Sequence, residues 1–221
     1  MKTKISIRSF SIFFLLFSNL LVNTALCEEA KINIDLDAKV TGFLESHREQ
    51  WADWNIPEAD GRVLYDLIIK NNYKNAVDIG TSTGHSAIWM AWALSKTGGR
   101  LITIEINEGR YKKALANFKE AGLSEYIDAR LADAHDLVKN LEGPFDFIFS
   151  DADKEWYKNY FIALAPKLDV GGCFTAHNVS ADYVRGIAEF LEYVQSLSNF
   201  DTTINRSSPA GISISYKRAE K

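Results

Sequence analysis

The stretch from Asn75 to Ser86, NAVDIGTSTGHS, constrains the fold of this chain more than any other. An apolar run with one acid, Ala-Val-Asp-Ile, leads into a glycine-containing turn, and a helical pattern follows the turn. Strand, glycine turn and helix form the first unit of a nucleotide-binding fold. Gly80 would let the backbone approach a ligand closely, because glycine has no Cβ. We therefore predict a ligand site at this turn.

The spacing of the glycines argues against two common kinds of phosphate site. Gly80 and Gly84 give G-x-x-x-G, whereas a dinucleotide site carries G-x-G-x-x-G and a phosphate loop carries G-K-[ST]. The acid Asp78 is poorly placed beside a pyrophosphate but suits a cationic or hydroxyl-bearing ligand. The turn therefore predicts a ligand that is not held by its phosphates.

The N-terminus has the layout of a secretory signal. Three basic residues precede an apolar run over residues 10–22, and the first acid is Glu28. We predict a signal peptide over residues 1–27 that ends at Ala25-Leu26-Cys27, which makes the protein exported, either periplasmic or secreted. An uncleaved signal would instead leave it anchored to the membrane, and a lipidated Cys27 is the third interpretation. Cleavage would leave no stable membrane association.

Composition predicts one globular domain of ordinary type. The chain has 221 residues, of which 47% are hydrophobic and 24% charged. Its formal net charge is −4 and it has no basic stripe, so a nucleic acid partner is not expected. Loss of the signal would leave Cys173 alone, which excludes an internal disulfide. We divide the mature chain into a helical segment, 28–56, and a ligand-binding domain, 57–221.

The hydrophobic pattern predicts a doubly wound α/β fold. It indicates a helix over residues 36–54 and a second helix that begins near Pro57. Trp51 and Trp54 either pack these helices on the domain, which we favour, or line a substrate mouth. Five strands then alternate with helices, and a β-hairpin follows, which predicts a Rossmann-like, mostly parallel seven-stranded sheet with a C-terminal antiparallel hairpin. The predicted strands are 76–79, 101–106, 127–131, 145–150, 173–176, 200–204 and 211–216, and the predicted helices between them are 86–95, 108–121, 134–140, 155–164 and 181–196.

Polar side chains stand at the ends of the five predicted parallel strands. Ligands of such sheets lie beyond the carboxyl ends of the strands, so function is expected there. Glu105 ends the second strand, where an acid can accept both hydroxyls of a ribose. Asp133 follows the third strand, and the plain alternative for it is a helix N-cap.

The segment DFIFSDADKEWYKNYF brings Asp151, Asp153 and Lys154 to one sheet edge. Two carboxylates so close repel unless a cation or hydrogen-bond donors compensate them. Asp151 with His177 and Asn178 of the next strand offers oxygen, nitrogen and oxygen ligands for a metal. Oxygen ligands suit Mg²⁺ or Ca²⁺, and imidazole shifts the preference toward Mn²⁺, Fe²⁺ or Zn²⁺. Lys154 is a candidate general base, or else a surface lysine paired with an acid.

Several of these motifs together resemble the class I S-adenosylmethionine-dependent O-methyltransferases. They are VDIGTSTGHSA, LITIE with a helix ending in KEAGL, DFIFSDADKEWYKNYF and GGCFTAHNVS, and they are similar above all to the cation-dependent caffeoyl-CoA and catechol branch. The resemblance runs from about Ile56 to Lys217. It implies cofactor contacts through Asp78, Gly80, Thr81, Ser86, Glu105, Asp133, Ala134 and Asp153, a metal ligand at Asp151, and a base at Lys154.

One departure from the family affects the predicted metal site. The family usually has Asp-Asn after the fifth strand, and this chain has His177-Asn178. Replacing a carboxylate by a neutral ligand weakens the binding of a hard cation. Divalent-cation dependence on Mg²⁺, Mn²⁺ or Ca²⁺ is therefore open, and a site without metal is the alternative.

The resemblance implies methyl transfer from S-adenosylmethionine to a hydroxyl of a small, phenolic or catechol-like acceptor. Two other functions stay open: an exported binding protein on a methyltransferase scaffold that transfers nothing, and a dinucleotide oxidoreductase, which lacks its glycine motif and ranks last. Export also raises the question of where the cofactor comes from. Family members are often dimers, so a homodimer is open as well.

Overall fold

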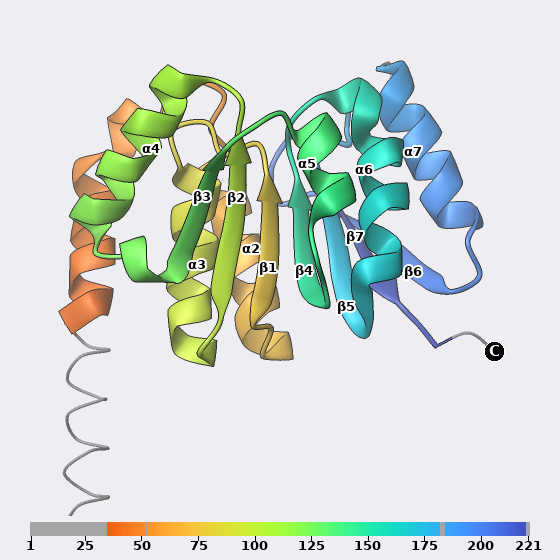
Figure 1. Cartoon of the computed structure of the whole chain (residues 1–221), viewed down its shortest axis with the longest axis horizontal. Helices are drawn as coiled ribbons and strands as arrows, with labels where there is room; N and C mark the ends of the chain where they lie inside the picture. Colours follow the sequence, from red (N-terminus) through yellow and green to blue (C-terminus); the bar gives the residue numbers. More distant parts are fainter. Residues whose placement is uncertain (1–34, 52, 182–183, 220–221) are drawn as a thin grey trace, which may run out of the picture.

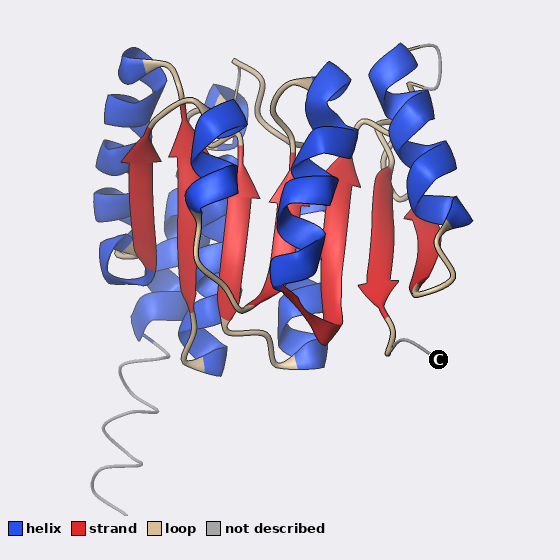
Figure 2. Ribbon diagram, turned by 45° about the vertical axis from the view of Figure 1, so that its right-hand side comes forward, coloured by secondary structure: helices blue, strands red, loops and turns tan. Residues whose placement is uncertain are grey.

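A single seven-stranded sheet with helices on both faces forms the body of the molecule (Figures 1 and 2). The computed structural model describes residues 35–51, 53–181 and 184–219, so the predicted signal over 1–27 lies outside it. The strands follow the order β3-β2-β1-β4-β5-β7-β6. Their bounds are β1 Asn75–Ile79, β2 Arg100–Glu105, β3 Ile127–Leu131, β4 Phe145–Ser150, β5 Leu168–His177, β6 Phe200–Asn205 and β7 Ile212–Lys217.

The predicted fold class is confirmed. Strands β1 to β5 pair in parallel, while β7 runs antiparallel to both β5 and β6. The chain order reverses between β1 and β4, where the sheet begins to be wound in the other direction. At such a switch point the loops after adjacent strands part, and a ligand can enter between them.

Two cores, one on each face, hold the helices to the sheet. One core lies under α2, α3 and α4, and the other lies under α5, α6 and α7. Buried parallel strands need apolar residues on both faces, and β4 shows this with Phe147 in one core and Ile148 in the other. The helices are α2 Glu58–Asn71, α3 His85–Thr97, α4 Glu108–Ala121, α5 Ala134–Asn140, α6 Tyr157–Leu164 and α7 Arg185–Ser196, with short 3₁₀ turns η1 Arg48–Gln50, η2 Ser124–Tyr126, η3 Lys154–Trp156 and η4 Ala165–Lys167. None of the described helices is both long and apolar enough to cross a membrane.

The first helix is shorter than the pattern over 36–54 predicts. Residues 35–46 are helical, and the η1 turn follows after His47. The side chains of Ser46 and His47 both lie 3.0 Å from the carbonyl oxygen of Phe43, so they satisfy the last turn and end the helix there. Trp51 then leaves the helix axis and stacks on His85 with the ring centroids 4.3 Å apart, as the favoured packing interpretation expects.

Gly80 brings β1 against β4 at the glycine turn. Its φ is +107°, and a Cβ there would stand 2.9 Å from the backbone carbonyl of Asp151. The backbone N–H groups of Gly80 and Thr81 both donate to the carbonyl oxygen of Ile104, at 3.1 and 3.0 Å. The turn is thus closed on both sides by neighbouring strands, and only glycine fits it.

We expect Gly80→Ala to lower the free energy of unfolding by roughly 2–4 kcal/mol, because it adds a steric clash to the cost of a positive φ. Gly171→Ala is the matched control, since Gly171 has a φ of +85° and no atom within 4 Å of an added Cβ. It should cost only about 1 kcal/mol. Urea unfolding of both variants measures the difference, and equal losses would show that the close approach to Asp151 carries no energy.

Candidate functional site

A cavity of about 850 Å³ opens beyond the carboxyl ends of the parallel strands. The walls come from the loops after β1 to β5, from η3 and from the start of α7. Most of the side chains predicted at the strand ends meet in it. The predicted residues that line it are Gly80, Glu105, Asp133, Ala134, Asp151, Asp153, Lys154, His177 and Asn178.

Three predicted cofactor residues lie behind the cavity wall. Asp78, Thr81 and Ser86 are buried, and none of them lines the cavity. One carboxylate oxygen of Asp78 accepts from the hydroxyls of Ser86 at 3.1 Å and Thr103 at 2.9 Å, and the other oxygen is buried without a partner. Burial raises the pKa of Asp78 to about 7, although the two hydroxyl donors oppose this. In this structure these side chains support the glycine turn from below.

Glu105 is held rigidly at the end of β2. It is 6% exposed, and its carboxylate accepts from the backbone N–H of Ser82 at 2.7 Å and from that of Asn107 at 2.9 Å. Each carboxylate oxygen has a second lone pair, so both can accept a further hydrogen bond from a ligand in the cavity. A fixed carboxylate with free acceptor capacity suits the recognition of a diol.

Asp133 and Asp153 join the cavity wall through His135. Asp133 caps α5 by accepting from the backbone N–H of His135 at 2.9 Å, as the plain alternative expects, and it also lines the cavity. The His135 ring lies between the two carboxylates, 3.2 Å from Asp133 and 3.3 Å from Asp153. Its ring centroid is 4.1 Å from that of Trp156. The His135 ring is also nearly parallel to that of Tyr160, with the ring centroids 5.8 Å apart, and both of these residues line the cavity.

The rim of the cavity includes a tryptophan that the sequence analysis assigned to packing. Trp54 is 82% exposed and lines the cavity, so the packing interpretation is wrong for this residue. The preceding residue, Asp53, forms a two-point ion pair with Arg110 at 2.6 and 3.0 Å and accepts from the hydroxyl of Ser82 through its carbonyl oxygen. The loop that contains Asp53 and Trp54 is therefore held against the glycine turn through Ser82. The sequence offers no pattern that marks it.

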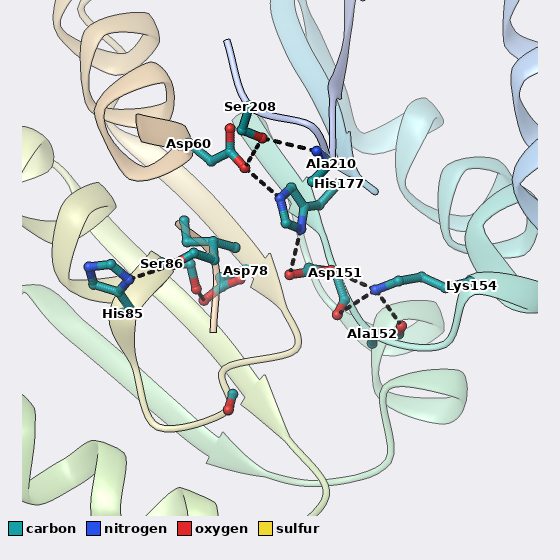
Figure 3. Close-up of polar contacts among 12 residues, drawn as sticks. Asp60, Asp78, His85, Ser86, Asp151, Ala152, Lys154, His177, Ser208 and Ala210 are labelled. Carbon is teal, nitrogen blue, oxygen red and sulfur yellow. Dashed lines mark hydrogen bonds and ion pairs between the residues drawn. The ribbon is translucent and has the colours of Figure 1, made fainter. Parts of the chain in front are cut away.

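Four titratable side chains are joined by ion pairs, and we call them the charged array: Asp60, His177, Asp151 and Lys154 (Figure 3). Asp60 is buried behind the cavity wall, and the other three line the cavity. His177 Nε2 lies 2.8 Å from Asp60 Oδ2, and His177 Nδ1 lies 3.1 Å from Asp151 Oδ2. Lys154 Nζ donates to Asp151 Oδ1 at 2.6 Å. Charges of opposite sign thus alternate along the array.

The sequence analysis missed Asp60. It stands in the first turn of α2, where an acid is ordinary, and its partner His177 is 117 residues away. The side chain is 1% exposed, and Oδ2 also accepts from the hydroxyl of Ser208 at 2.7 Å. A buried acid at a helix start is the one signal that marks it, and that signal appears only once the fold is known.

His177 carries a positive charge in this arrangement. Both ring nitrogens face carboxylate oxygens, so both must donate, and only the imidazolium has two N–H groups. Burial alone would lower the pKa of His177, but the hydrogen bonds and charges of Asp151 and Asp60 raise it to about 9. The ring is therefore a buried cation at neutral pH.

The residues predicted as metal ligands do not fit a divalent cation in this geometry. A ligating histidine must offer a nitrogen lone pair, and both nitrogens of His177 are turned to carboxylates. Both oxygens of Asp151 are also occupied, one by His177 and one by Lys154. Over 35–51, 53–181 and 184–219, no group of three or more His, Cys, Asp or Glu side chains is arranged to hold a metal ion. Asn178 lines the cavity beside this array.

A family model described as O-methyltransferase matches residues 43–183 of the chain. Caffeoyl-CoA O-methyltransferase 1 of Eucalyptus globulus is 36% identical over 127 residues, which cover 54% of this chain and 51% of that protein. Flavonoid 3',5'-methyltransferase of Vitis vinifera is 30% identical over 141 residues, which cover 61% of this chain and 59% of that protein. The chain thus spans about half the length of the first of these curated relatives.

The crystal structure of an O-methyltransferase from Bacillus cereus in complex with SAH is similar over most of the chain. The TM-score is 0.72 at 25% sequence identity, and the match covers 82% of this chain and 91% of that one.

The charge on His177 predicts a pH dependence of stability. The pKa of His177 is raised from 6.5 to about 9 on folding, so its contribution is full below about pH 6.5 and is lost as the pH rises through 9. We expect urea unfolding to show a loss on the order of 2–3 kcal/mol between pH 6.5 and 9.5 that His177→Gln does not show. The raised pKa values of Asp78 and Cys173 also affect stability within this window, but they are common to both proteins and cancel in the difference between the two curves. Parallel pH curves for the two proteins would contradict a buried imidazolium.

Proposed function

The chain belongs to the O-methyltransferase family whose model matches residues 43–183, and from this premise we propose that it transfers a methyl group from S-adenosylmethionine to a hydroxyl of a small phenolic acceptor. The observation that supports this most directly is that one cavity holds both halves of the site. Glu105 and the glycine turn stand at one side of it, and Asp151 and Lys154 stand at the other. The phenolic acceptor is suggested by the names of the relatives from Eucalyptus globulus and Vitis vinifera.

The residues on the cofactor side fit S-adenosylmethionine. Glu105 would accept the ribose hydroxyls, and the Gly80 turn would let the backbone approach the methionine part. Asp133 and Ala134 would lie at the adenine, beside the ring of His135. SAH, the demethylated form of this cofactor, is named in the complex of the Bacillus cereus enzyme. When bound, the cofactor supplies an electrophilic methyl group on a positively charged sulfur.

On the acceptor side, Lys154 is the base that we propose for the phenolic proton. Its ammonium group lies on three oxygens in this structure: Asp151 Oδ1 and the carbonyl oxygens of Asp151 and Ala152. To act as the base, Lys154 would first release one proton to solvent through the cavity. The amine would then accept the phenolic proton on the freed lone pair, while a remaining N–H group keeps its bond to Asp151. Asp151 keeps a cationic partner throughout, because His177 stays bonded to its other oxygen. Holding the phenolic oxygen against the methyl group would supply much of the remaining rate.

The second candidate is a binding protein on the same scaffold that transfers nothing. The full occupation of the Lys154 ammonium group favours it, because an ammonium group with three acceptors is not a base. The two candidates differ in one result. Both predict binding of SAH, and only the enzyme forms a methylated product.

We also propose that the protein is exported, on the signal pattern over residues 1–27 and the helical segment 28–56 that precedes the domain 57–221. Its partner would then be a small acceptor outside the cytosol, and a homodimer remains a proposal from family analogy. N-terminal sequencing of the protein from a secretion host checks the first point. A start at Glu28 supports cleavage, and an intact Met1 would favour an anchor.

Removal of the charge on Glu105 should weaken cofactor binding. Glu105→Gln keeps the volume but removes one acceptor and the negative charge, so we expect SAH to bind about 10- to 100-fold more weakly in calorimetric titration. Glu108→Gln is the matched control, since Glu108 is an exposed acid three residues along and should bind SAH like the unmodified protein. Equal affinities for all three proteins would remove Glu105 from the cofactor site.

Lys154→Met should abolish methyl transfer and leave cofactor binding intact. We expect the rate of product formation with a phenolic acceptor to fall by about 10²- to 10⁴-fold, which is the usual contribution of a general base. SAH affinity should stay within about twofold, since Lys154 lies on the acceptor side. Lys158→Met, one helical turn away, serves as the control. A Lys154→Met protein that keeps its rate would rule out the base, and product formed by none of these proteins would favour the binding protein.

A further inference from the structure

The charged array crosses the molecule between elements that are remote in the sequence. Asp60 comes from α2, His177 from the end of β5, and Asp151 from the loop after β4. Their side chains are 1%, 4% and 8% exposed, respectively, so the three charges interact in a nearly water-free environment. In such an environment a charge is tolerated only when a partner compensates it.

We propose that His177, held through both ring nitrogens between Asp60 and Asp151, takes the place that a divalent cation would need beside Asp151, so that this site works without a metal ion. The role that this gives His177 in methyl transfer rests on the proposed function. The metal-free state of the site itself does not, because it follows from the contacts within the charged array.

The two carboxylates leave no common point at which a cation could bind. Asp60 and Asp151 approach opposite sides of the His177 ring, through Nε2 and Nδ1 (Figure 3). A cation cannot contact both carboxylates while the ring stands between them. A cation that binds Asp151 alone meets the positive charges of both His177 and Lys154 at hydrogen-bond distance from the same carboxylate. Electrostatic repulsion therefore opposes metal binding at Asp151, the acid of the charged array that lines the cavity.

Displacement of His177 would leave Asp60 as an uncompensated buried charge. Among the residues that the structure describes, the partners of Asp60 Oδ2 are His177 and the neutral hydroxyl of Ser208, and Oδ1 is buried with no hydrogen-bond partner. The carboxylate thus depends on the imidazolium for its charge balance. Asp60 is in this sense the positioning residue that keeps His177 protonated and turned toward Asp151.

The backbone around His177 also holds the ring in place. The hydroxyl of Tyr157 donates to the carbonyl oxygen of His177 at 3.1 Å, and His177 pairs with Ile212 of β7 in the sheet. Ser208, between β6 and β7, accepts from the backbone N–H of Ala210 at 3.2 Å while it donates to Asp60. The C-terminal hairpin therefore helps to hold His177 in place, and the imidazole ring has little freedom to turn a nitrogen toward a metal ion.

The test is a titration of the purified full chain with Mn²⁺, in which electron paramagnetic resonance measures the concentration of unbound Mn²⁺. We expect no Mn²⁺ bound at 1 mM to the unmodified protein, and the same melting temperature and SAH affinity with or without EDTA. His177→Asp removes the cation and adds a carboxylate beside Asp151 and Asn178, so it should gain at least a 10-fold increase in Mn²⁺ affinity. His47→Asp, a histidine outside the charged array, is the control and should gain none.

A stoichiometric Mn²⁺ site in the unmodified protein that Asp151→Asn removes would overturn the proposal, as would methyl transfer that EDTA stops and Mn²⁺ restores. Where His177→Asp does not fold without metal, recovery of its melting temperature by Mn²⁺ gives the same information. If the unmodified protein binds neither Mn²⁺ nor SAH and His177→Asp binds Mn²⁺, the proposed function fails and the metal-free site stands.

Discussion

The structure depends on how two buried carboxylates are compensated beneath one cavity. Asp60 and Asp151 lie on either side of His177, and their side chains are only 1% and 8% exposed. The imidazolium between them makes burial of both acids tolerable, and it links α2, β4 and β5 through charge as well as packing. Ser208, between β6 and β7, joins the same set of contacts through Asp60, and Lys154 joins it through Asp151.

The same arrangement explains how an O-methyltransferase scaffold can retain Asp151 and Lys154 on the proposed acceptor side while a histidine, His177, stands where the family usually has an aspartate. A carboxylate after the fifth strand would leave Asp151 in need of a cation from solution. His177 brings that charge with the chain, and Asp60 balances it. His177 considered without Asp60 has only the features of a weakened metal ligand.

Sequence alone was sufficient for the sheet, because strand and helix patterns depend on neighbours in the chain. Local patterns predicted the strands, the closing hairpin and the place of Glu105 at the end of β2. The known topology of doubly wound sheets then predicted how these elements are arranged. Sequence alone was insufficient where a contact joins remote segments. The sequence around Asp60 gives no sign of its contact with His177. Trp54 reaches the cavity rim in a segment that was predicted to be helical, because the first helix ends at residue 46. Asp78 was predicted to contact the cofactor, and its side chain lies behind the cavity wall. The sequence predicted that the acidic strand ends meet. It did not predict that His177 would lie between two carboxylates and compensate their charge.

The most direct measurement is a crystal structure of the protein grown with SAH and Mn²⁺, with diffraction collected at the manganese absorption edge. The account predicts SAH in the cavity with its ribose on Glu105, the His177 ring between Asp60 and Asp151, and no anomalous peak within reach of Asp151. An anomalous peak on Asp151 with His177 turned away would contradict the metal-free site. Absence of SAH from the cavity would contradict the methyltransferase assignment itself.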